Sequence, residues 1–150
     1  MIFEAFMKEL RNIPGLEELK PDKAGVYSLR INHIHYIYFA ESSKHHALSL
    51  YAPLCEIPSD HLRKDSLYDL LMTANFFGQN SGNGWFASDH LSHQVFYLSN
   101  IPLELLSKDR FASELQQFIS CLAHWKSKIH EVETMHLPRK FKEQSSYLKP

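Results

Sequence analysis

The stretch SLYDLLMTANFFGQNSGNGWFASD, residues 66–89, joins an apolar helical segment to a turn rich in glycine and asparagine and then to a strand. Leu67 and Leu71 lie on one side of the predicted helix, and Met72 and Phe76 lie on the next side. A helix that is apolar on nearly all sides is either buried in a core or packed at an interface. Two interpretations follow: a central core helix of a monomer, or a helix that packs against a second copy.

We favour the second copy, because a chain of 150 residues has room for only one core. A two-fold dimer is the commonest arrangement that buries the same surface on both copies. We therefore predict a homodimer whose interface contains apolar residues of this helix and of the strand that follows: Leu67, Leu70, Leu71, Ala74, Phe76, Phe77 and Trp85.

The composition is that of a globular protein, with 44% hydrophobic and 22% charged residues in 17.5 kDa. We expect a single domain over residues 1–137, followed by a polar, partly basic tail over 138–150. The formal net charge of −1 favours no interaction with phosphate backbones, so we predict no nucleic-acid partner. No apolar run is long enough to cross a membrane and no signal peptide is evident, which predicts a cytoplasmic protein.

The first part of the chain predicts a helix followed by three strands. Apolar residues recur at helical spacing from Ile2 to Ile13, and Pro14 and Gly15 end the helix. Three strand-length segments come next, joined by loops short enough for hairpins: 26–31, 35–41 and 47–53.

The second part predicts a helix, two strands and a final helix. The middle helix begins near Ser59 or Asp60, or after a new cap at Ser66, and ends near Gly78. Strands at 85–89 and 94–100 follow, and Ser107 or Asp109 caps the last helix. The fold class is therefore α+β, with the order α-βββ-α-ββ-α, an antiparallel twisted sheet and three helices.

The second predicted strand is apolar on both faces. Ile34, Tyr36 and Tyr38 alternate with Ile37 and Phe39, whereas a sheet with one face in water alternates apolar with polar residues. Either the last helix wraps over the second face, or that face is left for a partner. We favour a partner, because three helices in a chain of this length can cover one face of the sheet well but can hardly cover both faces.

The two cysteines and ten histidines give weak evidence for chemistry. Cys55 and Cys121 lie among apolar residues without CxxC spacing, which predicts reduced, buried thiols. His33 and His35 could join a histidine of another turn in a zinc site, but no HExxH or CxxC motif accompanies them. We expect solvated turn histidines, no metal, no cofactor and no catalytic residues, since Cys121 beside His124 lies on an apolar stripe that disfavours the thiolate.

The ordered set of motifs resembles the class I chaperones of bacterial type III secretion, the CesT, SycE and SicP-like or Tir chaperone family. The likeness covers about residues 3–130. It rests on a helix, a glycine-containing turn, a strand pair and a closing helix, in which the matching positions are Leu67, Tyr68, Leu70, Leu71, Ala74, Asn75, Gly84, Leu98, Pro102, Leu103, Leu106, Phe111, Leu115, Phe118, Ala123 and Trp125.

The resemblance implies a homodimer that binds the N-terminal segment of a secreted effector, keeps it extended and delivers it to the secretion apparatus. An effector segment can add as a strand to a sheet edge while its apolar side chains enter grooves. We predict the binding residues on the first helix and first two strands: Phe3, Phe6, Met7, Leu29, Ile31, Ile37 and Phe39. The alternatives are a dimeric protein-binding module of the same fold with a partner outside secretion, and a zinc protein based on histidine.

Overall fold

The helices and strands follow the predicted order, and the α+β fold class is confirmed. The computed structural model describes residues 2–77 and 82–135, so the predicted tail over 138–150 lies outside the described residues. The elements are α1 (Ile2–Arg11), β1 (Tyr27–Ile31), β2 (His35–Ser42), β3 (Ala47–Glu56), α2 (His61–Phe77), β4 (Gly84–Asp89), β5 (Gln94–Pro102), a short 3-10 turn η1 (Leu103–Leu105) and α3 (Lys108–Met135).

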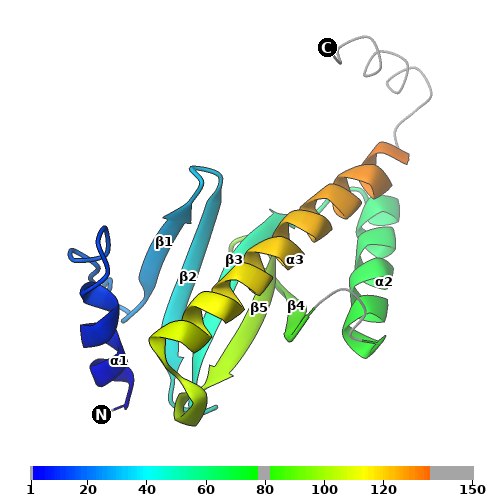
Figure 1. The fold of residues 1–150 in the computed structure, drawn as a ribbon. Helices are drawn as coiled ribbons and strands as arrows, with labels where there is room; N and C mark the ends of the chain where they lie inside the picture. The colour runs from blue at the N-terminus through cyan, green and yellow to red at the C-terminus, as the bar shows by residue number, and fades with distance from the viewer. Residues whose placement is uncertain (1, 78–81, 136–150) are drawn as a thin grey trace.

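The five strands form one antiparallel sheet in the order β1-β2-β3-β5-β4. The first three strands are neighbours in sequence, as a meander requires, and β5 then pairs with β3 and leaves β4 at the far edge (Figure 1). One row of side chains crosses four strands, because Tyr38 pairs with Tyr51, Tyr51 with Leu98, and Leu98 with Trp85.

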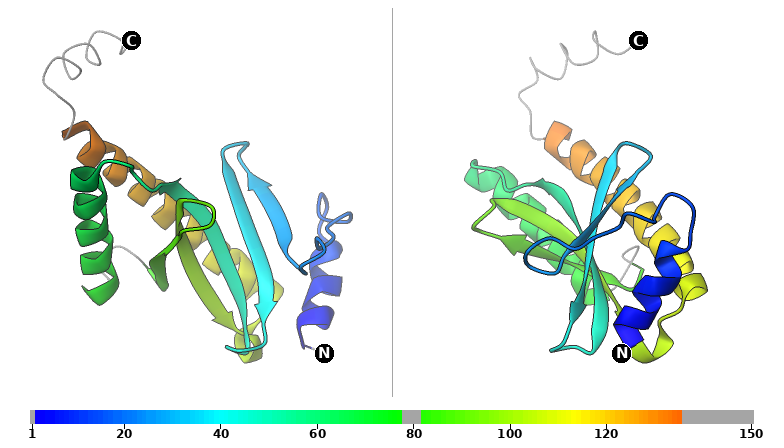
Figure 2. Two further views of the ribbon diagram at one scale, coloured as in Figure 1. Left: turned by 180° about the vertical axis from the view of Figure 1, so that it is seen from behind. Right: turned by 90° about the vertical axis from the view of Figure 1, so that its left-hand side faces the viewer.

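The long helix α3 crosses one face of the sheet, which we call the inner face (Figure 1). Tyr97 packs on Phe118 with ring centroids 4.7 Å apart, and Phe86 packs on Trp125 at 4.9 Å. Seen from behind, no helix crosses the opposite face, which we call the outer face (Figure 2). The last helix therefore covers only one face, and the interpretation in which it wraps over both is wrong.

The two shorter helices lie at opposite edges of the sheet (Figure 1). Helix α1 lies near the start of β1, where Phe6 contacts Phe111 of α3 at 5.2 Å and Phe3 contacts Tyr27 at 6.1 Å between ring centroids. Helix α2 lies beside β4 at the other edge. One short helix thus lies at each edge of the sheet: α1 contacts the start of β1, and α2 runs beside β4.

The start of α2 distinguishes between the predicted alternatives. Asp60 precedes the helix, and its carboxylate oxygen Oδ1 accepts a hydrogen bond of 3.3 Å from the Leu62 amide. Ser66 lies inside the helix, so a new start at Ser66 is wrong. For α3, Ser107 is the cap, because its hydroxyl oxygen accepts a bond of 3.1 Å from the Arg110 amide.

Gly84 opens β4 at a point where the chain has no space for a side chain. A Cβ added there would lie 2.5 Å from the Leu98 carbonyl oxygen and 2.5 Å from the Tyr97 ring. A glycine lets the backbone approach this closely. Gly84 therefore fixes how tightly β4 closes on β5.

The helices of the described residues are too short or too polar to cross a membrane.

Candidate functional site

The β4 edge of the sheet is closed by a side chain. Asn75 of α2 donates from Nδ2 to the Phe86 carbonyl oxygen at 3.0 Å, and its Oδ1 accepts from the Phe86 amide at 2.8 Å. One amide group thus takes both main-chain groups of Phe86, as a neighbouring strand would. Because Asn75 occupies them, the main-chain amide and carbonyl of Phe86 are not available to pair with another strand.

The β1 edge is different. Within residues 2–77 and 82–135, β1 pairs with β2 alone. Helix α1 lies at its Tyr27 end, and no other strand lies beside the rest of it (Figure 1). An edge strand of this kind presents unpaired main-chain groups to an incoming chain.

A groove runs between α1 and β1. Its volume is about 280 Å³, and its lining combines apolar floor residues with charged residues of α1: Phe3, Glu4, Met7, Lys8, Arg11 and Tyr27. We call it the α1–β1 groove. It lies next to the β1 edge, so one extended segment can pair with the strand and place a side chain in the groove.

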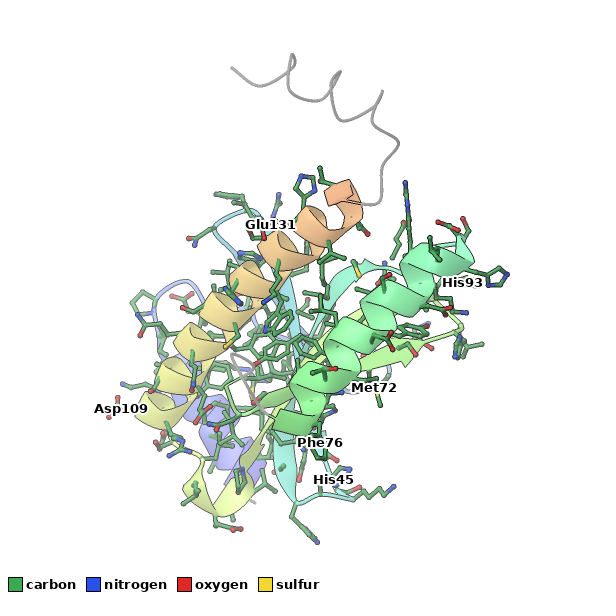
Figure 3. All side chains as sticks on the ribbon, turned by 90° about the vertical axis from the view of Figure 1, so that its right-hand side faces the viewer. His45, Met72, Phe76, His93, Asp109 and Glu131 are labelled. Carbon is green, nitrogen blue, oxygen red and sulfur yellow. The ribbon has the colours of Figure 1, made fainter. Side chains whose placement is uncertain are left out.

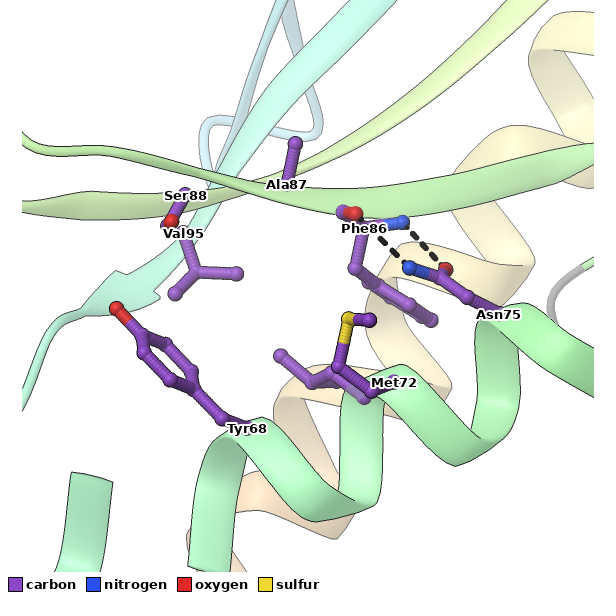
Figure 4. Close-up of a pocket in the computed structure, with 8 residues that line it drawn as sticks. Tyr68, Met72, Asn75, Phe86, Ala87, Ser88 and Val95 are labelled. Atoms are coloured by element: carbon purple, nitrogen blue, oxygen red, sulfur yellow. Dashed lines mark hydrogen bonds between the residues drawn. The ribbon is translucent and has the colours of Figure 1, made fainter. Parts of the chain in front are cut away.

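A second pocket lies between α2 and the strands β4 and β5 (Figure 4). It has a volume of about 120 Å³, and we call it the α2 pocket; it is lined by Tyr68, Leu71, Met72, Asn75, Phe86, Ala87, Ser88 and Val95. Figure 4 shows the Tyr68 ring pointing from α2 towards Val95 and Ser88. Among the described residues, no group hydrogen-bonds the buried Tyr68 hydroxyl oxygen.

Next to this pocket, two large apolar side chains of α2 point into solvent. Met72 is 66% exposed and Phe76 is 83% exposed. Figure 3 shows both near the C-terminal end of α2. Met72 thus extends the apolar surface of the pocket out to the exposed side of α2.

The outer face of the sheet carries a row of aromatic side chains. Tyr38 stacks on Tyr51 with centroids 5.5 Å apart, and Tyr51 meets the edge of Phe96 at 6.2 Å. At one margin, the Arg30 guanidinium lies 5.4 Å from the ring of Tyr36. Burial raises the pKa of the Tyr51 hydroxyl, and the charge of Asp22 adds to this. The apolar second face predicted for β2 is thus present and is not covered by a helix.

The predicted effector-binding residues lie close together but face mostly inward. Phe3 and Met7 line the α1–β1 groove, and Ile31 is half-buried at the end of β1. Phe3 and Met7 are nevertheless only 8% and 2% exposed, and they belong to the core together with Phe6, Leu29, Ile37 and Phe39. Ile37 and Phe39 belong to the inner face under α3, so Ile31 is the one residue of the seven that is not buried. The assignment of the seven to effector binding stays a prediction.

The predicted dimer residues divide in the same way. Leu67, Leu71 and Ala74 are buried against the chain's own core, and Leu70 is half-buried. Phe76 and Trp85 are exposed, whereas the side chain of Phe77 lies outside the described part. Their assignment to a dimer interface likewise stays a prediction.

The histidines of the described residues do not gather into a metal site. His33 lies in the β1–β2 turn with a φ of 58°, whereas His35 begins β2 and is only 9% exposed. Within the described ranges, no three His, Cys, Asp or Glu side chains gather in a way that could hold a metal ion. Burial raises the pKa of the Cys55 thiol to about 12, with smaller contributions from Glu133 and Glu56, so Cys55 is a poor nucleophile at neutral pH.

Three features of the candidate site were not predicted from the sequence. The aromatic row of the outer face was foreseen only at Tyr36 and Tyr38, although Tyr51 and Phe96 also alternate with buried residues and could have been found. Asn75 was noted as a family position without a role. The α2 pocket has no sequence signal, because its lining comes from three separate elements.

Three solved structures share this fold at low sequence identity. The HopA1–SchA chaperone–effector complex contains a chain with a TM-score of 0.66 and 16% identity, covering 84% of this chain and 94% of that one. A chain of the ExsC–ExsE complex has a TM-score of 0.68 and 17% sequence identity, and the match covers 83% of this chain and 91% of that chain. The structure of the Yersinia pestis type III secretion chaperone SycH in complex with a stable fragment of YscM2 has a TM-score of 0.60 and 20% sequence identity. The match covers 82% of this chain and 98% of that chain. These likenesses confirm the fold.

A search of curated protein sequences finds no significant match. The model of the Tir chaperone protein (CesT) family matches residues 5–126. The chain therefore belongs to the Tir chaperone protein (CesT) family. The predicted resemblance, which rested on the helix before Gly84, the strand pair and the closing helix, is confirmed.

Proposed function

We propose that this protein is a bacterial, cytoplasmic type III secretion chaperone that binds the N-terminal segment of a secreted effector, keeps it extended and delivers it to the secretion apparatus. It acts as a homodimer and catalyses no reaction. The observation that carries this proposal is the open β1 edge beside the α1–β1 groove. Membership of the Tir chaperone family supports it, as do the neighbouring structures, which include the HopA1–SchA chaperone–effector complex.

The geometry suits an extended client. Pairing with β1 supplies main-chain hydrogen bonds that any sequence can make, and the groove beside Tyr27 accepts an apolar side chain. Ordering such a segment costs about 2–5 kcal/mol or more, so one groove alone is insufficient. The uncovered aromatic row on the outer face adds apolar surface that the client can cover further along its path.

Co-expression tests this function. The chain is produced with the N-terminal segment of a secreted effector from the same bacterium, and we expect the two to elute together from a sizing column. A segment with its apolar residues changed to serine should not co-elute. If no effector segment of that bacterium binds, and loss of the chaperone gene leaves secretion unchanged, the proposal is wrong.

Blocking the groove tests the place of binding. Lys8 lines the groove and is exposed, so Lys8→Cys carrying a bulky maleimide should abolish client binding. Lys44→Cys with the same label, in the loop between β2 and β3, is the matched control and should bind normally. Equal binding by both labelled variants would remove the groove from the proposal.

A further inference from the structure

The β1 edge of the sheet is flanked by basic side chains. Lys8 and Arg11 of α1 lie one helix turn apart and line the α1–β1 groove, and Arg30 is exposed on β1. Arg30 is three residues beyond Tyr27 of the groove lining, which is about 10 Å along a strand. Three cations thus lie within reach of one short added strand.

Within the described residues, these three cations are not neutralised by ion pairs. No carboxylate of residues 2–77 and 82–135 lies within ion-pair distance of Lys8, Arg11 or Arg30. Arg11 donates from Nε to the Leu19 carbonyl oxygen at 3.0 Å, which positions its guanidinium but does not neutralise it. The groove lining also contains the acid Glu4, so the lining carries two positive charges and one negative charge.

Two acidic side chains of the loop between α1 and β1 are held by main-chain amides instead. The Glu17 carboxylate accepts a hydrogen bond of 2.8 Å from the Gly15 amide. Asp22 accepts bonds of 2.8 and 2.9 Å from the Ala24 and Val26 amides. These acids shape the loop and leave the cations of the edge unpaired. A peptide that pairs with β1 is therefore favoured if it brings negative charge.

Strand geometry fixes where on the peptide this charge belongs. Successive side chains of a strand alternate between the two faces. The peptide residue beside Tyr27 therefore points to the groove, and the residue beside Arg30, three positions away, points to the outer face. There the Arg30 guanidinium lies 5.4 Å from the ring of Tyr36, its partner on β2. Stacking occupies the flat face of a guanidinium and leaves its N–H groups for a carboxylate.

We infer that the segment that pairs with β1 is acidic as well as apolar: one apolar side chain enters the α1–β1 groove, and an Asp or Glu three positions away pairs with Arg30. This deepens the proposed function and rests on it, because it gives the client of that edge a charge and a spacing. Lys8 and Arg11 strengthen the attraction, most of all at low salt.

Selection from a displayed library of short random peptides tests the charge independently of any effector. At low salt, the unchanged protein should enrich peptides with Asp or Glu three positions from Leu, Ile, Phe or Met. Arg30→Glu should enrich Lys or Arg at that position instead. Lys44→Glu makes the same charge change in the β2–β3 loop and should enrich the same peptides as the unchanged protein. Acidic peptides selected by Arg30→Glu, or no enriched peptide at all, overturn the inference.

A double-mutant cycle measures the contact. One enriched peptide and its Glu→Gln version are titrated by fluorescence anisotropy against the unchanged protein and against Arg30→Gln. Loss of the peptide charge should weaken binding to the unchanged protein about two- to fivefold, as expected for a cross-strand ion pair, and should change binding to Arg30→Gln little. The factor should shrink as salt is added, because Arg30 is exposed. Equal effects on both proteins show that the acid does not pair with Arg30 and overturn the inference.

Effector segments separate this inference from the proposed function. If the peptides show the preference that depends on Arg30 and no effector segment binds, the inference holds for the β1 edge and the chaperone function fails. If an effector segment binds Arg30→Glu as well as it binds the unchanged protein, the function stands and the inference is wrong. Because Arg30 is on the surface, urea unfolding should show that its variants are as stable as the unchanged protein.

Discussion

Asn75 and Phe86 are joined by two hydrogen bonds, one from the Asn75 amide nitrogen to the Phe86 carbonyl at 3.0 Å and one from the Phe86 amide to the Asn75 oxygen at 2.8 Å. This pair ties α2 to the edge strand β4. It also leaves the sheet with two unlike edges, because within the described residues β1 pairs with β2 alone.

Replacing Asn75 with Ala should destabilise the protein by about 1–3 kcal/mol, because both main-chain groups of Phe86 lose their partners in a partly buried place. Urea unfolding measures the loss. Thr73→Ala, on an exposed position of the same helix, is the control and should change stability little. Equal stability of the two variants would mean that water replaces the amide at no cost.

Gly84→Ala should cost about 1–3 kcal/mol through overpacking, because its Cβ meets the Leu98 carbonyl and the Tyr97 ring at 2.5 Å. Neither a backbone carbonyl nor a ring buried under α3 can move aside easily. Thermal unfolding gives the comparison, with exposed Ser88→Ala of the same strand as control. A Gly84→Ala protein as stable as the control would show that β4 can shift away from β5.

His35 should make stability depend on pH. Burial lowers its pKa below the ordinary value of 6.5, with a further contribution from the charge of Lys126, so the folded state favours the neutral ring. The unfolded chain then binds the proton at a higher pH than the folded chain does. The contribution of neutral His35 to the free energy of unfolding is fully present above about pH 6.5. It is lost as the pH falls from 6.5 to the lower pKa of the folded state.

Urea unfolding at several pH values tests this prediction. His35→Phe should show a smaller loss of stability below pH 6.5 than the unchanged protein, whereas His45→Phe, exposed in a loop, should keep the full loss. The same pH dependence in all three proteins would assign the effect to other groups.

Cys55 should resist alkylation in the folded protein. Burial raises its pKa to about 12, and Glu133 and Glu56 add to the effect, so almost no thiolate exists at pH 8. Mass spectrometry of the Cys55 peptide after iodoacetamide treatment should find it unmodified in buffer and fully modified in urea. Rapid labelling in buffer would show that the end of β3 opens often.

Client binding should protect β1 and leave β4 unchanged. A client strand on β1 bonds every second amide of the edge, since alternate residues of an antiparallel pair exchange hydrogen bonds. Amide exchange followed by NMR should slow at alternate residues of Tyr27–Ile31, whereas the Phe86 amide is already bonded and should not change. Protection of β4 instead would place the client at the other edge.

The order of elements could be predicted from the sequence because it depends on local patterns. The stripe along α3 has the period of a helix, β2 and β5 are apolar runs of strand length, and Gly and Pro mark several of the turns. The start of α2 was left open, since both Asp60 and Ser66 are good caps and only tertiary packing selects the earlier one. The 3-10 turn at Leu103–Leu105 was missed for the same reason.

The candidate site was less predictable. Alternation shows that Phe39 and Tyr38 face opposite sides of the sheet, but it does not show which side a helix covers. Phe39 therefore was predicted in a groove and lies in the core, whereas Tyr38 lies on the uncovered face. The role of Asn75 depends on a contact with Phe86, eleven residues away across a turn, and no periodicity reports such a contact.

The unequal edges of the sheet also limit growth. A sheet with two receptive borders can recruit strands on both sides, whereas the Asn75 contact at Phe86 leaves β1 as the border open to an added strand. Two copies of this sheet therefore cannot stack edge to edge through β4 at Phe86, and an extended passenger is directed to one side of the molecule.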